Sequence, residues 1–145
     1  MSELIEATEL PVSPEERAND RVVLVVLLVD ALLLALLELM YVGFTIGTVP
    51  VPISAVVALV TTPLLVVGAG GLSVGRFGTA LPFLVWIATF CGLGFGGPGG
   101  DVLLPVYQPL VQWSNLSALL LAVFGLVPTA FVLGRVLRAK GLTVR

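Results

Sequence analysis

Two acidic residues inside an apolar stretch are the side chains of this chain best placed to do chemistry. Asp30 and Glu38 interrupt the run Val22–Tyr41, whose other residues are all aliphatic, sulfur-containing or aromatic. On a helix that turns roughly 100° per residue, the two carboxyl groups would share roughly one face, about 80° apart. At roughly 1.5 Å per residue, Asp30 would lie about 12 Å and Glu38 about 24 Å from the start of the run.

Asp30 needs a compensating interaction if this run spans a membrane, because an acid at the centre of a membrane helix costs about 2.5–3.5 kcal/mol on insertion scales. An ion pair within the chain is excluded at that depth, since every Lys and Arg lies outside the apolar stretches. Three arrangements are open. Asp30 could be protonated and hydrogen-bonded inside the protein, could face a wet cavity that binds a cation or proton, or could pair with a group of another subunit. The candidate hydrogen-bond donors at a similar depth are Trp86, Thr62, Thr89 and Thr129.

Glu38 lies close to the outer end of the run, so we expect its carboxylate to reach water at that surface. It does not form an acid pair with Asp30, because about 12 Å of helix separates their backbones. The chain has no histidine, and its only lysine, Lys140, is near the carboxyl end. With no nucleophile beside a base, the sequence predicts no enzymatic activity, no metal site and no cofactor.

Four apolar stretches organise the chain around these acids. A bilayer core about 30 Å thick needs about 20 helical residues, and each stretch is close to that length. Hydrophobic residues make up 58% of the 145-residue chain and charged residues only 11%, against about 25% charged in a typical soluble domain. The sequence therefore predicts an all-α, integral membrane four-helix transmembrane bundle, with spans at Val22–Tyr41, Ile53–Ser73, Thr79–Gly97 and Leu116–Leu133.

The basic residues predict an orientation for this bundle. All seven lie before the first span, between the second and third, or after the fourth: Arg17, Arg21, Arg76, Arg135, Arg138, Lys140 and Arg145. Because basic loops are retained in the cytoplasm, both termini are expected there. The Val-, Leu-, Ala- and Gly-rich composition, with Arg preferred to Lys, suggests a bacterial inner (plasma) membrane. Nucleic-acid binding is not expected, because there is no extended basic face.

The remaining segments divide into two tails and one long connection. Residues 1–21 are acidic and read as a disordered cytoplasmic tail, in which Ser13 or Asn19 could cap the first helix. Residues 22–134 form the four-span domain, and residues 135–145 a basic tail at the anionic inner leaflet. The connection 98–115 is too apolar for a free loop, so we expect it to lie in the outer interface or to re-enter the membrane.

Small residues four apart recur as three glycine pairs. Such pairs let membrane helices approach closely, either inside the bundle, which we favour, or at a subunit interface. The candidate packing residues are Gly43 with Gly47, Gly71 with Gly75, and Gly92 with Gly96.

These observations favour a non-catalytic accessory or structural subunit of a membrane complex, whose partners are the lipid bilayer and other membrane subunits or further copies of itself. The alternative is a small proton- or cation-coupled transporter that works as an oligomer through Asp30. An integral-membrane enzyme that acts on lipid is the weakest of the three hypotheses, because the residues for it are missing.

Overall fold

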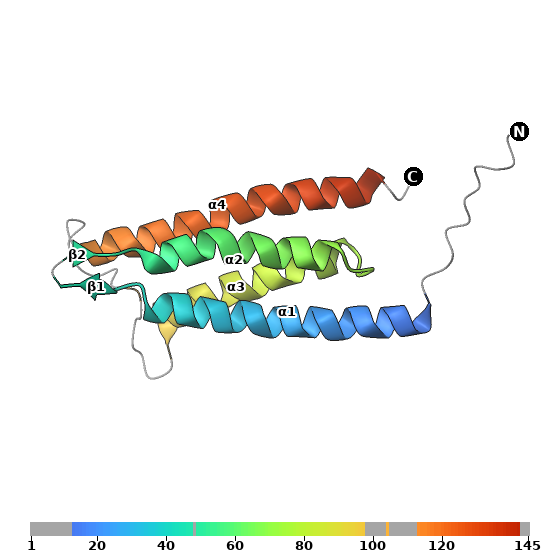
Figure 1. The fold of residues 1–145 in the computed structure, drawn as a ribbon, viewed down its shortest axis with the longest axis horizontal. Helices are drawn as coiled ribbons and strands as arrows, with labels where there is room; N and C mark the ends of the chain where they lie inside the picture. The colour runs from blue at the N-terminus through green and yellow to red at the C-terminus, as the bar shows by residue number, and fades with distance from the viewer. Residues whose placement is uncertain (1–12, 48, 98–103, 105–112, 143–145) are drawn as a thin grey trace, which may run out of the picture.

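The structure, a computed structural model, describes residues 13–47, 49–97, 104 and 113–142. Within them the chain forms four helices and one short hairpin, in the order α1 Pro14–Met40, β1 Thr45–Ile46, β2 Val49–Pro50, α2 Ile53–Gly70, α3 Arg76–Gly96 and α4 Trp113–Leu142. The helices lie side by side in an elongated bundle, in which α2 packs against α1, α3 and α4 (Figure 1).

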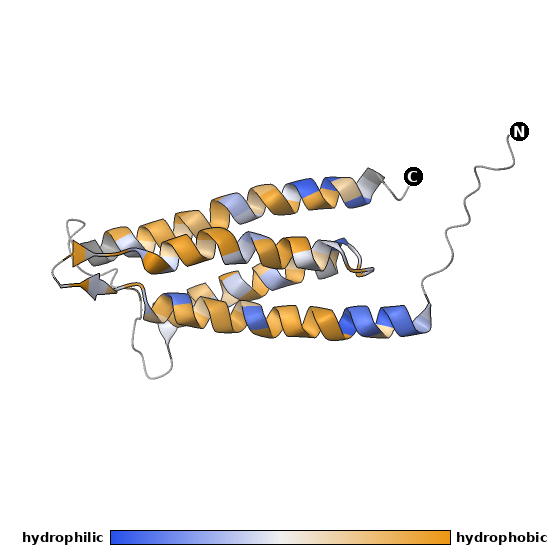
Figure 2. Ribbon diagram, viewed as in Figure 1, coloured by the Kyte–Doolittle hydropathy of each residue, from blue (hydrophilic) through white to orange (hydrophobic). Residues whose placement is uncertain are grey.

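All four helices are long and apolar enough to cross a membrane. Hydrophobic residues occupy most of their length, and hydrophilic residues gather in the first turns of α1 and the last turns of α4 (Figure 2). The predicted all-α architecture with four membrane-length helices is confirmed, and it is the architecture that a multi-pass membrane protein requires.

The first helix begins well before the predicted span. Ser13 caps it through a capping box, in which Ser13 Oγ accepts from the Glu16 amide at 3.1 Å and the Ser13 amide donates to Glu16 Oε2 at 2.9 Å. Pro14 occupies the first turn, where its missing amide costs nothing. Residues 14–21 are therefore helical, and the expected disordered tail is wrong for that part. Residues 1–12 lie outside the described residues.

The other helix ends also differ from the predicted spans. Helix α2 ends at Gly70 and α3 begins at Arg76, so the turn between them is residues 71–75. Helix α4 continues as far as Leu142, which makes most of the predicted basic tail helical. Gly134 disfavours a helix but does not end α4. The Arg, Leu, Ala and Lys residues that follow it are all good helix formers. Residues 143–145 lie outside the described residues.

The α1–α2 and α3–α4 connections differ in kind. Between α1 and α2, Thr45 pairs with Pro50 and Ile46 with Val49 in an antiparallel hairpin. Gly47 takes a positive φ of 62° there, a conformation that glycine adopts without strain. Of the predicted connection 98–115, residues 113–115 belong to α4, and Leu104 is buried with its amide donating to Gly94 O at 3.0 Å. Whether the rest re-enters the membrane lies outside the described residues.

Polar contacts fasten the α2–α3 turn to α1 and to α4. Asp20 of α1 accepts hydrogen bonds from the backbone amide of Ser73, at 2.7 Å, and from the Ser73 hydroxyl. Lys140 of α4 donates to Leu72 O at 2.9 Å and to Val74 O at 3.2 Å. We call Asp20, Leu72, Ser73, Val74 and Lys140 the end clamp. It holds α1 and α4 against the same turn.

Candidate functional site

A buried carboxylic acid lies where α1, α2 and α3 meet. Glu38 is 0% exposed. Its Oε2 accepts a hydrogen bond from Trp86 Nε1 at 2.8 Å, and its Oε1 lies 3.2 Å from Thr61 Oγ1. The prediction that Glu38 reaches water at the outer surface is therefore wrong. The candidate site is the cluster of Glu38, Thr61 and Trp86.

The pattern of small residues on α1 explains why Glu38 faces inward. Ala31 and Ala35 are both 0% exposed and lie four residues apart, where their small side chains let the neighbouring helices approach. Glu38 is three residues beyond Ala35 and so falls on the same helix face. This alanine spacing is the signal in the sequence that could have identified Glu38 as the inward acid.

Packing from two directions fixes the Trp86 indole. On α3 it stacks on Phe90, with ring centroids 5.2 Å apart and planes 9° apart, and also lies beside Phe83 at 6.5 Å. On α4 the indole lies over Gly125, where a Cβ atom would come within 2.4 Å of the ring. The indole can therefore turn its N–H toward Glu38 only because α4 has no side chain at that position.

Thr61 is the member of the site that the sequence did not identify. Its hydroxyl lies 2.9 Å from Val57 O, one helical turn earlier, as well as near Glu38. A threonine hydroxyl in a helix commonly donates back to the carbonyl four residues before it. Nothing in the residues around Thr61 distinguishes it from Thr62, and only the packing of α2 against α1 selects it.

Asp30 lies outside this cluster. It is exposed on α1, so the arrangement in which it is bonded inside the bundle is not the one the structure adopts. The four donors proposed for it have other surroundings. Trp86 binds Glu38, Thr89 donates to Val85 O at 2.9 Å, and the buried hydroxyls of Thr62 and Thr129 have no hydrogen-bond partner among the described residues.

Asp30 instead interrupts an exposed apolar face. Val26 and Leu33, four residues before it and three after it, are each 53% exposed, and Leu37 is 49% exposed. Residues at these spacings surround Asp30 on the helix surface. We call Val26, Asp30, Leu33 and Leu37 the α1 outer face. Its chemistry is that of a lipid-facing surface with one carboxyl group in the middle.

The predicted glycine pairs do not mediate close packing between the described helices. A Cβ atom at Gly43, Gly47, Gly75, Gly92 or Gly96 would meet no other atom within 4 Å, and at Gly71 it would meet only Gly68 O at 3.6 Å. Packing inside the bundle, the role that the sequence favoured for them, is therefore wrong. A role at a subunit interface stays a prediction. Two glycines outside these pairs, Gly70 against Val136 and Gly125 against Trp86, each make room for a large apolar side chain of a neighbouring helix.

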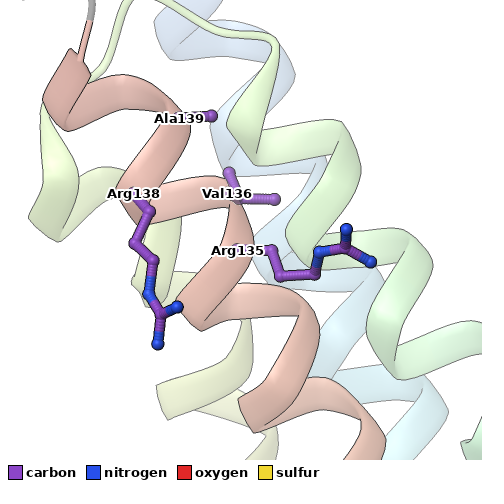
Figure 3. A pocket seen from close by; sticks show the side chains of 4 residues that line it. All are labelled: Arg135, Val136, Arg138 and Ala139. Atoms are coloured by element: carbon purple, nitrogen blue, oxygen red, sulfur yellow. The ribbon is translucent and has the colours of Figure 1, made fainter.

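A shallow hollow of about 500 Å³ lies at the basic end of α4 and is lined by Arg135, Val136, Arg138 and Ala139. The two arginine side chains extend from the helix in different directions (Figure 3). The Arg135 guanidinium lies 5.7 Å from the centre of the Phe131 ring. Because the two cations do not converge, this hollow is not built to hold a single anion.

The end clamp adds one perturbed acid. Asp20 precedes the apolar run that begins at Val22, so it lies outside the membrane-spanning part of α1. Hydrogen bonds from the Ser73 hydroxyl and then the Ser73 amide hold the pKa of Asp20 below its usual value, because they stabilise the charged carboxylate. The ionised form of Asp20 is therefore the one that fastens the turn.

The buried cluster and the α1 outer face are thus two separate sites on one helix, one facing the bundle and one facing away from it. The buried cluster contains the carboxyl group of Glu38, and the α1 outer face contains that of Asp30. In comparisons with protein-family models, curated proteins and solved structures, nothing matches this chain.

Proposed function

We propose that this chain is a non-catalytic subunit of a membrane complex and that it docks on its partner through the α1 outer face. The observation that carries the proposal is the exposure of Asp30 among Val26, Leu33 and Leu37. In lipid a carboxyl group in this position costs about 2.5–3.5 kcal/mol. A partner that supplies a hydrogen bond or a positive charge removes that cost.

The partner we propose is a different membrane protein with a donor or basic side chain at mid-depth. The described basic residues of this chain lie at its clamped end: Arg17 and Arg21 flank Asp20, and Arg76 approaches Gly141. Asp30 lies ten residues beyond Asp20 along α1, about 15 Å from the clamped end at about 1.5 Å per residue, so we propose that the cation at its depth comes from a different protein. A buried Arg or Lys of the partner would complete the pair, as intramembrane charges commonly do.

The orientation we propose places the clamped end in the cytoplasm of a bacterial cell, with the chain in the inner membrane. The support is the concentration of basic side chains at that end, since basic flanks are retained inside. Both termini then lie in the cytoplasm, and the β1–β2 hairpin faces outward.

Transport is the second candidate function, and the same exposure of Asp30 supports it. If copies of this chain assemble through α1, Asp30 would face a pathway between them and could bind a proton or cation. The two functions differ in what covers the outer face, which is a different protein in the first case and a second copy in the second.

Site-specific photo-crosslinking in membranes distinguishes these cases. A photoreactive amino acid at Leu33, next to Asp30, is expected to give one product whose mass exceeds the chain by that of a different protein. The matched control is the same amino acid at Leu64, which is 61% exposed on a different helix, α2. It should yield no discrete product.

The dependence on Asp30 completes the experiment. In the Asp30→Leu background the Leu33 product should be lost, and in Asp30→Asn it should be reduced, because the amide keeps hydrogen bonding but not charge. A product that persists in Asp30→Leu would overturn the proposal. A product of twice the chain mass would overturn the different-protein partner in favour of self-assembly, and proton-linked uptake into proteoliposomes that Asp30→Asn abolishes would then establish transport.

A further inference from the structure

The Glu38 cluster has a hydrogen-bonding pattern that fixes where its protons must lie. Trp86 Nε1 is a donor only, so Glu38 Oε2 accepts from it, at 2.8 Å. Thr61 has one hydroxyl proton and two oxygen neighbours, Val57 O at 2.9 Å and Glu38 Oε1 at 3.2 Å. A single proton cannot serve both contacts at full strength.

The distances assign the Thr61 proton to Val57 O. A hydroxyl that donates to a carboxylate forms a charge-assisted bond of about 2.5–2.7 Å. The 3.2 Å separation from Glu38 Oε1 is much longer, while 2.9 Å to Val57 O is an ordinary hydrogen bond. Glu38 Oε1 then faces a lone pair of the Thr61 oxygen. Glu38 Oε1 and Thr61 Oγ1 would then be two acceptors facing each other with no proton between them, unless Glu38 Oε1 is itself protonated.

The charges around the site lead to the same conclusion. Helix α2 contains no ionisable side chain, and on α3 the ionisable residues are Arg76, in its first turn, and the exposed Cys91. On α4 the first is Arg135, ten residues beyond Gly125, and on α1 Asp30 lies on another face. A carboxylate at Glu38 would therefore be fully buried without a counter-charge from the four described helices, an arrangement that proteins avoid by protonation.

We infer that Glu38 is a proton-binding site inside the bundle, a neutral carboxylic acid whose Oε1–H faces Thr61 Oγ1, its nearest acceptor, across 3.2 Å. Thr61 then donates to Val57 O, and Trp86 donates to the other carboxyl oxygen of Glu38. The site takes a proton rather than a metal cation, because the Trp86 N–H presents a positive edge to the one carboxyl group. This inference does not depend on any partner at Asp30.

Infrared spectroscopy of the full chain in nanodiscs at neutral pH tests the assignment. A protonated carboxyl group absorbs apart from a carboxylate, and its band moves to lower frequency in D2O. Uniform ¹³C-glutamate labelling of the unaltered protein should shift such a band. The other five glutamates, Glu3, Glu6, Glu9, Glu15 and Glu16, lie in the first 16 residues, so Glu38 is the one glutamate within the four apolar stretches of the sequence.

Variants assign the band to the residue. The glutamate band should vanish in Glu38→Gln, which keeps one donor and one acceptor in the same shape, and persist in Asp30→Asn. In Thr61→Val the band should move to higher frequency, because the acidic proton loses its acceptor. The inference is overturned if the unaltered protein shows no ¹³C-sensitive protonated glutamate band, or if Glu38→Gln leaves that band in place.

Discussion

At the scale of single residues, the two acids in the apolar part of α1 have exchanged the roles that their depth alone would give them. Asp30, nearer mid-depth, is exposed, whereas Glu38, near the helix end, is fully buried and bonded to Trp86. The reason is their position around the helix axis. Glu38 lies on the same helix face as the buried Ala31 and Ala35, whereas Asp30 lies about 80° away from Glu38 around the axis. Depth along a helix therefore says less about an intramembrane acid than the side of the helix it occupies.

Removing the indole N–H should destabilise the bundle through Glu38. Trp86→Phe keeps an aromatic ring over Gly125 and beside Phe90 but leaves Glu38 Oε2 without its donor. The loss of a partner for a buried polar atom costs about 1–3 kcal/mol, so the thermal midpoint in detergent should fall. The control is the same substitution in Glu38→Leu, where no acceptor is left. If Trp86→Phe lowers the midpoint equally in both backgrounds, the hydrogen bond is not responsible.

At the scale of elements, helix contacts in this bundle depend on where a side chain is missing. Gly125 makes the space on α4 that the Trp86 ring fills, and Gly70 does the same on α2 for Val136 of α4. Both are single glycines outside any pair four residues apart that the sequence highlighted. Their use depends on which large residue lies opposite them.

Filling the Gly125 space should displace the indole. A Cβ atom there would lie 2.4 Å from the Trp86 ring, so Gly125→Ala should cost about 1–3 kcal/mol of overpacking and lower the thermal midpoint. Gly134→Ala on the same helix meets no atom within 4 Å and is the matched control. Alanine is the better helix former, so this control should leave the midpoint unchanged or raise it. Equal effects at both positions would contradict the assigned contact.

The end clamp predicts that the stability of the chain depends on pH, because Asp20 holds the α2–α3 turn. Because the pKa of Asp20 is lowered in the folded chain, its contribution to stability is present at neutral pH and disappears as the pH falls through the folded pKa. Asp20→Asn should be less stable than the unaltered chain at pH 7. The two should converge as the pH drops below about 4, the usual range for aspartate. Thermal midpoints measured across pH check this, and a constant difference would contradict it.

At the scale of the whole molecule, charge and hydropathy are separated along the long axis. The polar first turns of α1 and the basic last turns of α4 lie at one end, while the apolar parts of the four helices make up most of the bundle (Figure 2). The six described basic residues belong to that end.

This polarity predicts where a reporter will be active. An enzyme that functions only in the cytoplasm, fused after Arg145, should be active in a bacterial host, and one that functions only outside should be inactive there. A fusion within the β1–β2 hairpin should give the opposite pattern. Activity of the external reporter at the carboxyl terminus would contradict the proposed orientation.

Composition and charge were enough to predict the four helices, since apolar stretches of membrane length determine them without reference to neighbours. The ends were predicted less well, because Ser13 and Glu16 start α1 through a local capping box within polar sequence, beyond the reach of a hydropathy argument. The site was predicted only in part. Glu38 and Trp86 were singled out but not paired with each other, and Thr61 was missed, because those contacts depend on how three helices turn toward one another.

The end clamp has a mechanical consequence. Asp20 and Lys140 hold one short turn between them, so the first and last helices are coupled where they leave the lipid, although they are far apart in sequence. Because α1 and α4 are bonded to the same turn, we expect any separation of these two helices to begin at the end of the bundle opposite the clamp.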